Sequence, residues 1–260
     1  MVAIASLRVA SLATLLSISS FCCAAPDAQA ILAASDAVRN PSKPFVVTVN
    51  LLEYRNARQT DSSTLAAYSK TDSSTEQYRT LVRIVAPQRD ANKLMLKNGN
   101  DLWFFDPASQ ASIRLSPQQR LLGQAANGDV VTVNLAKDYK AVLQGEEELT
   151  DGERVMRRAY KLDLAAVSPD VTYHRVEMWV DTTSSRPIKA RFFAESGKLL
   201  KTAFYRKFQP QLGRERPTEV VIIDGLDPAW VTVIRYSDYA WRDVPDAWLQ
   251  RDFLPRFKPD

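Results

Sequence analysis

The spacing of apolar residues after Pro41 is the feature that most restricts what this chain can fold into. From Phe45 to Tyr239, apolar and polar residues alternate in segment after segment, and turn-forming residues separate the segments. A period of two is typical of β-strands, whose successive side chains point to opposite faces of a sheet. We expect strands at 45–52, 77–85, 93–97, 101–105, 112–115, 155–164, 173–181, 187–195, 198–208, 218–224 and 230–239.

The turns between these segments are typical of antiparallel neighbours. Asn98-Gly99 is a dipeptide that tolerates positive φ in tight turns, and Asp151-Gly152 and Ser196-Gly197 mark further turns. About ten or eleven antiparallel strands form a sheet too wide to stay flat and open. A strongly curled sheet of that width encloses more space than its own side chains easily fill. The sequence therefore predicts a mainly β protein with a curled antiparallel sheet and an internal cavity.

Helices and loops complete the expected fold. Helical spacing predicts a helix at 27–38, which Asp27 caps and Asn40-Pro41 ends. The polar residues 56–75 predict an exposed loop. Two short helices are predicted at 118–122 and 129–136, and a terminal helix at 246–253. We expect helical pieces to cover the open side of the sheet as a lid, which includes Leu121 and Leu122.

The first 25 residues have the pattern of a cleaved secretory signal. Arg8 precedes an apolar stretch at 9–21, and small residues follow at 22–25. Cleavage near Ala24 or Ala25 leaves the helix at 27–38 whole, whereas the small-x-small site at 28–30 would sever it. An uncleaved membrane anchor is the alternative. We expect residues 26–260 to form a single domain.

Loss of residues 1–25 removes both cysteines, Cys22 and Cys23, so no disulfide can stabilise the mature chain. Phe21 precedes Cys22, where a lipid-modified cysteine needs a small residue, so we do not expect lipidation. Without Arg8, the 34 basic residues become 33 against 30 acidic ones. This small excess agrees with contact with anionic membranes and does not indicate a nucleic-acid-binding protein.

Few residues point to catalysis or metal binding. His174 is the sole histidine and lies in a predicted strand, so zinc, copper and iron–sulfur sites lack their usual ligands. The acidic residues 146–148, with Asp151 and Glu153, are either a solvated turn or a hard-cation site, and they lack the pattern of a calcium loop. The glycines are scattered and no serine lies in a nucleophile elbow. We expect no enzyme, no cofactor and no metal; carboxylates brought together from distant strands are the enzymatic alternative.

Several strands carry large apolar residues on both faces. Either helices cover the second face, or that face lines a cavity. A basic group surrounds Leu199 and Leu200 and consists of Lys198, Lys201, Arg206 and Lys207. These side chains are either a docking patch for a membrane or partner, or solvent-facing charges that prevent edge pairing.

An ordered set of motifs resembles the outer-membrane lipoprotein-sorting protein family, a LolA-like group. The matching segments are 101–107, 113–123, 127–130, 179–181, 186–189, 199–205, 216–220 and 243–250. The resemblance covers nearly all of residues 26–260. It implies an incomplete antiparallel β-barrel with a helical lid, whose cavity receives acyl chains in the periplasm, and an inner-membrane transporter that loads the carrier.

Strand parity places the candidate ligand-binding residues, although a one-residue shift in register would reverse each strand. We expect the apolar cavity to be lined by Trp103, Phe105, Val176, Met178, Phe192 and Val233. The favoured hypothesis is a monomeric periplasmic carrier that takes lipid or lipoprotein acyl chains from an inner-membrane transporter to an outer-membrane acceptor. The alternative is a periplasmic lipid-sensing regulator that resembles RseB.

Overall fold

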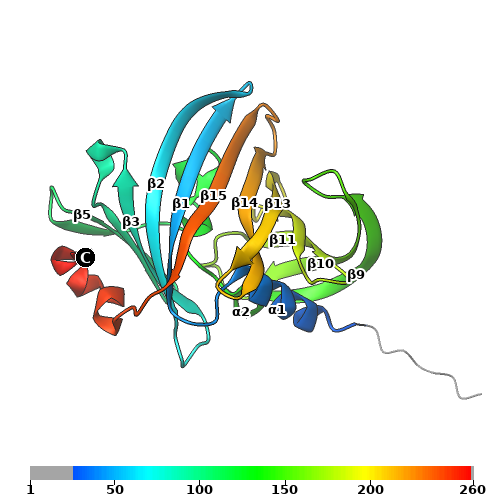
Figure 1. The fold of residues 1–260 in the computed structure, drawn as a ribbon, viewed down its shortest axis with the longest axis horizontal. Coiled ribbons are helices and arrows are strands. Elements are labelled where there is room, and N and C mark those ends of the chain that lie inside the picture. The colour runs from blue at the N-terminus through cyan, green and yellow to red at the C-terminus, as the bar shows by residue number, and fades with distance from the viewer. Residues whose placement is uncertain (1–25, 259–260) are drawn as a thin grey trace, which may run out of the picture.

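The computed structural model describes residues 26–258, in which strands are the main element (Figure 1). The α-helices are α1 (Ala28–Arg39) and α2 (Leu135–Asp138), and the 3₁₀ helices are η1 (Gln88–Asp90), η2 (Asn127–Asp129), η3 (Asp246–Leu249) and η4 (Arg251–Arg256). The strands are β1 (Phe45–Arg55), β2 (Arg58–Thr71), β3 (Tyr78–Ala86), β4 (Leu94–Asn98), β5 (Asp101–Asp106), β6 (Ala111–Arg114), β7 (Arg120–Leu122), β8 (Ala125–Ala126), β9 (Tyr139–Thr150), β10 (Met156–Ala166), β11 (Arg175–Asp181), β12 (Pro187–Phe193), β13 (Leu199–Gln211), β14 (Arg214–Asp224) and β15 (Trp230–Trp241). The expected secretory signal lies outside the described residues.

Helix α1 forms where local chemistry predicts it. The Asp27 carboxylate accepts a hydrogen bond from the Gln29 amide at 2.9 Å, which satisfies one of the free donors of the first turn. Asn40, in an extended conformation before Pro41, ends the helix. The helix buries Leu32, Ser35 and Asp36 on its inner face. The predicted helix is confirmed.

Within residues 26–258, thirteen strands form one antiparallel sheet that is strongly curved and not closed (Figure 1). Its order is β6-β5-β4-β3-β2-β1-β15-β14-β13-β12-β11-β10-β9. Each strand lies beside a neighbour in the chain except at one place, where β1 pairs with β15 from Phe45–Trp241 to Arg55–Trp230. The first and last long strands therefore join the two halves of the sheet.

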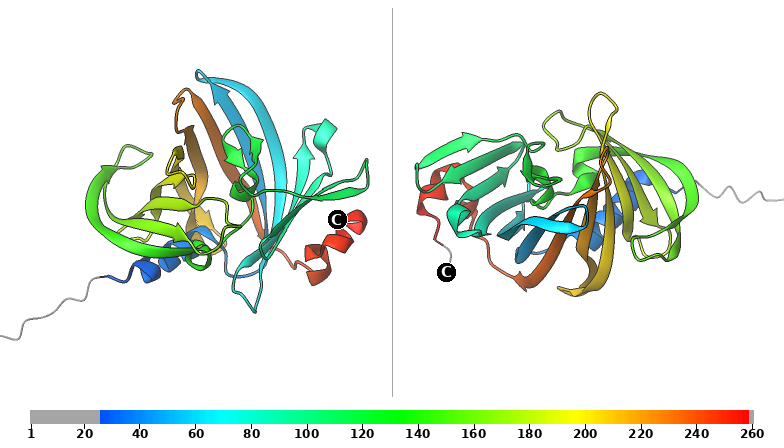
Figure 2. Two further views of the ribbon diagram at one scale, coloured as in Figure 1. Left: turned by 180° about the vertical axis from the view of Figure 1, so that it is seen from behind. Right: turned by 90° about the horizontal axis from the view of Figure 1, so that it is seen from above.

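This strand order determines where the segment between β6 and β9 must lie. The two strands are the opposite edges of the sheet, so the chain from 115 to 138 has to cross from one edge to the other. It crosses on the concave side, where β7, β8, η2 and α2 lie over the sheet (Figure 2). We call residues 115–138 the crossing segment.

Three secondary-structure predictions are wrong. Residues 56–75 are largely β2, not an exposed loop; Leu65 and Ala67 are buried opposite β1, and this tertiary contact outweighs the polar composition. The acidic residues 146–148 belong to β9, not to a turn, and pair with β10. The crossing segment contains a short β7–β8 hairpin where two helices were expected, and α2 has four residues.

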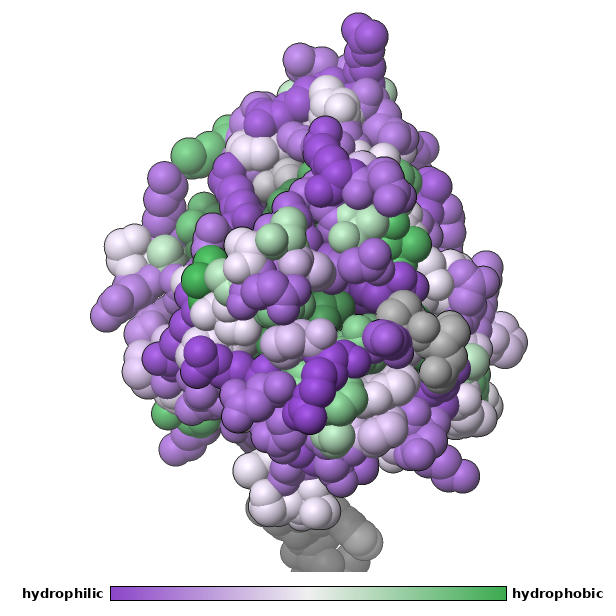
Figure 3. Space-filling view, turned by 90° about the vertical axis from the view of Figure 1, so that its left-hand side faces the viewer, coloured by the Kyte–Doolittle hydropathy of each residue, from purple (hydrophilic) through white to green (hydrophobic). Residues whose placement is uncertain are grey.

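Both faces of the sheet are covered near β4. Met95 packs into the core on the concave face, whereas Leu94 and Leu96 pack on the opposite face against the C-terminal segment. That segment consists of η3 and η4, where a helix was expected, and it buries Leu249 and Leu254. Figure 3 shows this side of the molecule as small apolar patches within a mainly hydrophilic surface. Both alternatives for the second apolar face are thus realised, on different strands.

None of the helices among residues 26–258 has the length and apolar character needed to span a membrane.

Candidate functional site

A cavity of about 150 Å³ lies between the concave face of the sheet and the crossing segment. Inward-facing residues of β1, β13, β14 and β15 form its floor, and residues of the crossing segment cover it. The apolar floor includes Phe45, Val47, Val49, Ala203, Ile222 and Ile234, and the cover includes Val130, Val131 and Val133.

Strand alternation explains why this wall is apolar. Along β1, Phe45, Val47 and Val49 are buried while the residues between them are only half-buried. On β14, Val220 and Ile222 point to the same face, and their neighbours across the sheet are Ile234 and Thr232 of β15. The parity of three neighbouring strands thus creates a mainly apolar surface.

The volume of the cavity sets what it can hold in this conformation. An engineered apolar cavity of about 150 Å³ in another protein binds benzene. The space therefore takes part of a hydrocarbon chain rather than a whole acyl chain. A longer ligand requires the crossing segment to move away from the sheet.

A buried ion pair joins the crossing segment to the sheet. The Lys201 ammonium on β13 contacts the Asp129 carboxylate and donates a hydrogen bond to the Gln124 carbonyl at 2.9 Å. Asp129 also accepts hydrogen bonds from the Tyr173 hydroxyl at 2.8 Å and from the Ala126 amide at 2.7 Å. Burial lowers the pKa of Lys201, while Asp129 opposes that shift. The pair therefore tethers the middle of the crossing segment to the cavity wall.

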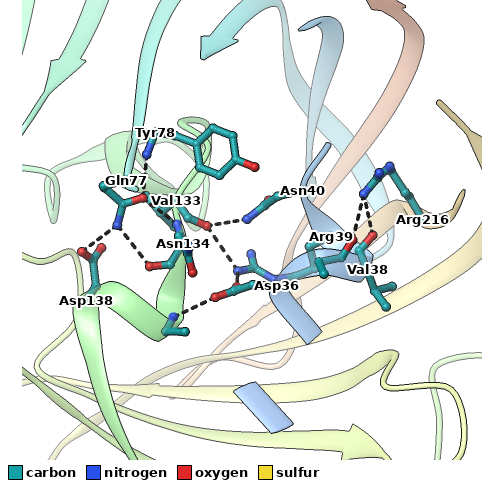
Figure 4. A network of polar contacts seen from close by, with 12 residues as sticks. Asp36, Val38, Arg39, Asn40, Gln77, Tyr78, Val133, Asn134, Asp138 and Arg216 are labelled. Carbon is teal, nitrogen blue, oxygen red and sulfur yellow. Dashed lines mark hydrogen bonds and ion pairs between the residues drawn. The ribbon is translucent and has the colours of Figure 1, made fainter. Parts of the chain in front are cut away.

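A second polar network closes the other end of the crossing segment (Figure 4). The Asp36 carboxylate of α1 contacts Arg39 and accepts a hydrogen bond from the Ala136 amide at 2.7 Å. Asn40 donates to the Val133 carbonyl at 2.8 Å. Since Val133 and Ala136 lie near the end of the crossing segment, these contacts hold it against α1.

Contacts from Gln77, just before β3, and from β14 extend this network. The Gln77 side chain donates to Asp138 at 2.8 Å and accepts from the Asn134 amide at 2.7 Å. On the other side of α1, Arg216 donates to the Val38 carbonyl at 2.9 Å, which satisfies a free carbonyl of the last helical turn (Figure 4). Helix α1 and the crossing segment are thus fixed to the sheet as one unit.

The β7–β8 hairpin is bound to the first residues of β15. The Gln124 amide donates to the Thr232 hydroxyl at 2.7 Å. Gly123 has φ +54°, and a Cβ at this position would overlap the Thr232 hydroxyl, so glycine is required. The Arg120 guanidinium lies 4.4 Å from the ring centre of Trp230, which is a favourable cation–π contact.

Of the six residues predicted to line the cavity, the structure places Phe192 there. Val176 and Met178 are buried in the same concave-face core but do not line the cavity. They lie deeper, on β11, where Val176 pairs directly with Phe192 of β12.

The other three predicted residues face away from the cavity, which corrects their assignment. Trp103 and Phe105 belong to the cluster beneath η3 and η4, while Leu102 and Phe104 of the same strand face the concave side. Val233 is half-buried on the outer side of β15, and the next residue, Ile234, lines the cavity. Each error is one of strand face, because a covered second face makes both parities apolar.

The residues predicted for the lid, Leu121 and Leu122, lie in β7 and pack half-buried against the concave-face core. His174 is exposed just before β11 rather than within a strand. Lys201 is buried in the cavity wall, so neither a docking patch nor a solvent-facing charge describes it. In the part of the chain that the structure describes, no group of three or more histidine, cysteine or acidic residues is placed to hold a metal ion.

Sequence reasoning missed the polar residues of the cavity. Asp129 and Lys201 are 72 positions apart, so no local pattern pairs them. Tyr205, Tyr236 and Tyr239 also line the cavity, and each lies in a predicted strand. The alternation of β13 placed Lys201 and Tyr205 on the same face as Ala203, and this was the available signal.

Comparisons with known proteins identify related folds. A family model described as that of an uncharacterised protein matches residues 76–256. The crystal structure of a LolA superfamily protein from Nitrosomonas europaea is 36% identical, with a TM-score of 0.78, and the match covers 88% of this chain and 100% of that chain. A search of the curated proteins finds no match.

Two further structures share the fold at lower identity. A candidate outer membrane lipoprotein-sorting protein domain from Vibrio parahaemolyticus is 16% identical, with a TM-score of 0.73, and the match covers 88% of this chain and 98% of that one. A DUF1329 family protein from Desulfovibrio piger is 19% identical, with a TM-score of 0.73, and the match covers 87% of this chain and 97% of that one. The similarity to MucB has a TM-score of 0.28 and carries no argument for the regulator alternative.

Proposed function

Because this chain belongs to the LolA superfamily, we propose that it is a carrier that binds acyl chains of lipids or lipoproteins in the cavity on the concave face of its sheet. One observation carries the proposal: an apolar cavity remains between the sheet and the crossing segment, lined by Phe45, Val49 and Ile222. In this proposal the sheet is an incomplete barrel, and the crossing segment, with Leu121 and Leu122, is its lid.

The energetics of lipid transfer require such a site. A chain of about sixteen carbons gains roughly 12 kcal/mol on leaving water, at about 0.8 kcal/mol for each methylene. A carrier has to offer a comparable apolar surface, and it also has to release the lipid. The contacts that hold the crossing segment against the sheet are compatible with release of the lipid. Several of them, including Lys201–Asp129 and Gln124–Thr232, are polar contacts that water can replace when the lid opens.

The proposed cellular role follows from the family and from the N-terminal pattern. Residues 1–25 direct the chain to the periplasm and are then removed, and residues 26–260 work there as one monomeric domain. An inner-membrane transporter loads the carrier, and an outer-membrane acceptor receives the cargo. The name of the Vibrio parahaemolyticus relative supports a role in lipoprotein sorting. The proposal is for binding and transfer rather than catalysis.

A cavity-filling substitution tests the proposal. Ala203 is buried in the cavity floor, and Ala203→Phe places a ring in a space of about 150 Å³. We expect binding of 1-monopalmitoylglycerol, measured by displacement of an environment-sensitive apolar dye, to weaken at least about tenfold. Overpacking costs about 1–3 kcal/mol, so a thermal melt checks that the variant is folded.

The matched control is Ala240→Phe, which makes the same change at an exposed position of β15. It should bind the lipid like the wild type. Equal binding by both variants, or no binding by the wild-type protein, would overturn the proposal. Mass spectrometry of molecules that co-purify with the periplasmic protein would identify the cargo.

A further inference from the structure

In the part of the chain that the structure describes, three tyrosine hydroxyls in the cavity wall have no hydrogen-bond partner. Tyr205 of β13 and Tyr236 and Tyr239 of β15 all line the cavity. Each ring packs half-buried against the concave-face core. Among the described residues, no group donates a hydrogen bond to these hydroxyls or accepts one from them. The three hydroxyl oxygens are not among the fully buried unpaired side-chain atoms, so they remain accessible to a small polar group, such as water or part of a ligand.

Three other buried tyrosines have partners for their hydroxyls, whereas Tyr68, which lies outside the cavity, has none among the described residues. The hydroxyl of Tyr78 donates to the Pro41 carbonyl at 2.7 Å, and that of Tyr139 donates to the Tyr173 carbonyl at 2.9 Å. Tyr173 donates to Asp129 at 2.8 Å. Tyr139 and Tyr173 also line the cavity, so among the cavity tyrosines the free hydroxyls are those on β13 and β15.

The three tyrosines lie close together and remain protonated. Tyr236 interacts electrostatically with both Tyr205 and Tyr239, and burial raises the pKa of all three. Each hydroxyl is thus a hydrogen-bond donor at every physiological pH. Arg39 adds a fourth donor at the same site, because it lines the cavity and its buried Nε has no partner. Its interaction with Tyr205 and Tyr236 places it beside them.

No cation in the described cavity lining lacks a carboxylate partner. Arg39 and Lys201 are the cations there, their partners are Asp36 and Asp129, and Asp138 adds a further carboxylate to the lining. A carboxylate or phosphate ligand would bring a buried charge with no counter-ion, which is costly. An uncharged carbonyl would instead accept hydrogen bonds from the free donors without adding charge.

We propose that Tyr205, Tyr236 and Tyr239 bind the uncharged ester or amide carbonyl that joins an acyl chain to its head group. This inference rests on the proposed function, since the chain itself occupies the apolar part of the cavity. It adds a chemical preference to that function. The site selects esterified or amidated acyl chains over free fatty acids, whose carboxylate would meet no unpaired cation in the lining and would lie near the Asp138 carboxylate.

Two ligands that differ in a single carbonyl test this preference. 1-Monopalmitoylglycerol has an ester carbonyl, and 1-O-hexadecylglycerol has an ether at the same position and the same chain length. We expect the wild-type protein to bind the ester about tenfold more tightly, as two neutral hydrogen bonds would give. Palmitate at pH 8 should bind more weakly than the ester. The dye-displacement assay described above measures all three.

Variants of the tyrosines assign the preference to their hydroxyls. The triple variant Tyr205→Phe/Tyr236→Phe/Tyr239→Phe keeps the rings and should bind the ester and the ether equally, at the affinity of the ether. The single variant Tyr236→Phe should lose part of the preference, about two- to fivefold. Tyr54→Phe is the matched control, because the Tyr54 hydroxyl has an exposed contact with Gln59 and lies outside the cavity lining.

The outcomes separate this inference from the proposed function. Equal binding of ester and ether by the wild type, a preference that survives in the triple variant, or tighter binding of palmitate than of the ester would each overturn the inference and leave the carrier function standing. If the wild type binds none of the three ligands, the carrier function itself fails. The hydroxyls have no partner within residues 26–258, so the melting temperature of the phenylalanine variants should stay close to that of the wild type.

Discussion

The buried pair of Lys201 and Asp129 should show strong energetic coupling in a double-mutant cycle. The Lys201 side chain is 4% exposed and that of Asp129 is 13% exposed, so both charges are largely removed from water. Removing one member of such a pair leaves the other charge buried without its partner, which typically costs about 3–5 kcal/mol. The perturbations are Lys201→Met, Asp129→Asn and their combination.

The remaining contacts place the cost at the lower end of that range. After Lys201→Met, Asp129 keeps the Tyr173 hydroxyl and the Ala126 amide as donors, so we expect a loss of about 3 kcal/mol. After Asp129→Asn, Lys201 keeps the Gln124 carbonyl at 2.9 Å, and we expect a similar loss. The double variant contains no buried charge at this site, so it should lose less than the sum, with a coupling of about 2–3 kcal/mol.

Urea unfolding measures these free energies. With a slope of about 3 kcal/mol per molar, a loss of about 3 kcal/mol moves the midpoint by about 1 M. Hydrogen exchange locates the effect. The amides of Asn127 and Gly128 bond to the Gln119 and Pro117 carbonyls within the crossing segment, and their protection should fall more than that of the β13 amides. Single variants that each cost less than about 1 kcal/mol and add without coupling would refute the reasoning, since surface ion pairs behave that way.

Two further predictions concern positions outside the cavity. Trp103→Ala should lower the free energy of unfolding in urea by about 2 kcal/mol, because the half-buried ring packs under η4 with the Arg251 guanidinium 4.2 Å from its centre. Lipid binding should be unchanged. Loss of binding in a folded variant would show that Trp103 does contribute to the cavity. Glu219 is buried among Arg206, Lys207 and Arg235, whose ion pairs and hydrogen bonds outweigh burial and lower its pKa. The ionised Glu219 carboxylate contributes its full stabilisation above the unfolded pKa of about 4.3, and this contribution is lost as the pH falls through the folded pKa. The Glu219→Gln variant should therefore lose less stability than the wild type between pH 5 and 3. Urea midpoints measured across this pH range test the prediction.

The local sequence determined the elements whose cause is local. Asp27 and Pro41 delimit α1 through capping and through the restricted backbone before proline. The alternation Phe45-Val47-Val49 makes β1 and assigns its buried face, because one strand face is clearly more apolar than the other. The turn at Asn98-Gly99 needs positive φ, and Gly99 has φ +57°. In each case a neighbour within a few residues supplies the physical reason.

Tertiary structure alone decided which of two apolar faces lines the cavity. On β5, Leu102 and Trp103 are both apolar, and the choice between them depends on η3 and η4, which come about 140 residues later and cover the Trp103 side. Residues 58–71 became β2 because β1 and β3 pair with both of its edges, which polar composition does not reveal.

The cavity chemistry was decided in the same way. Lys201 reads as a surface charge along the sequence, and it is buried because the crossing segment brings Asp129 over β13. The period of the apolar residues and the secondary-structure propensity are properties of a single segment, so both can be determined from the sequence. Contacts between distant segments decide which face of a strand lines the cavity and which residue pairs with a buried charge. These contacts form only when the sheet curls and the crossing segment packs over it.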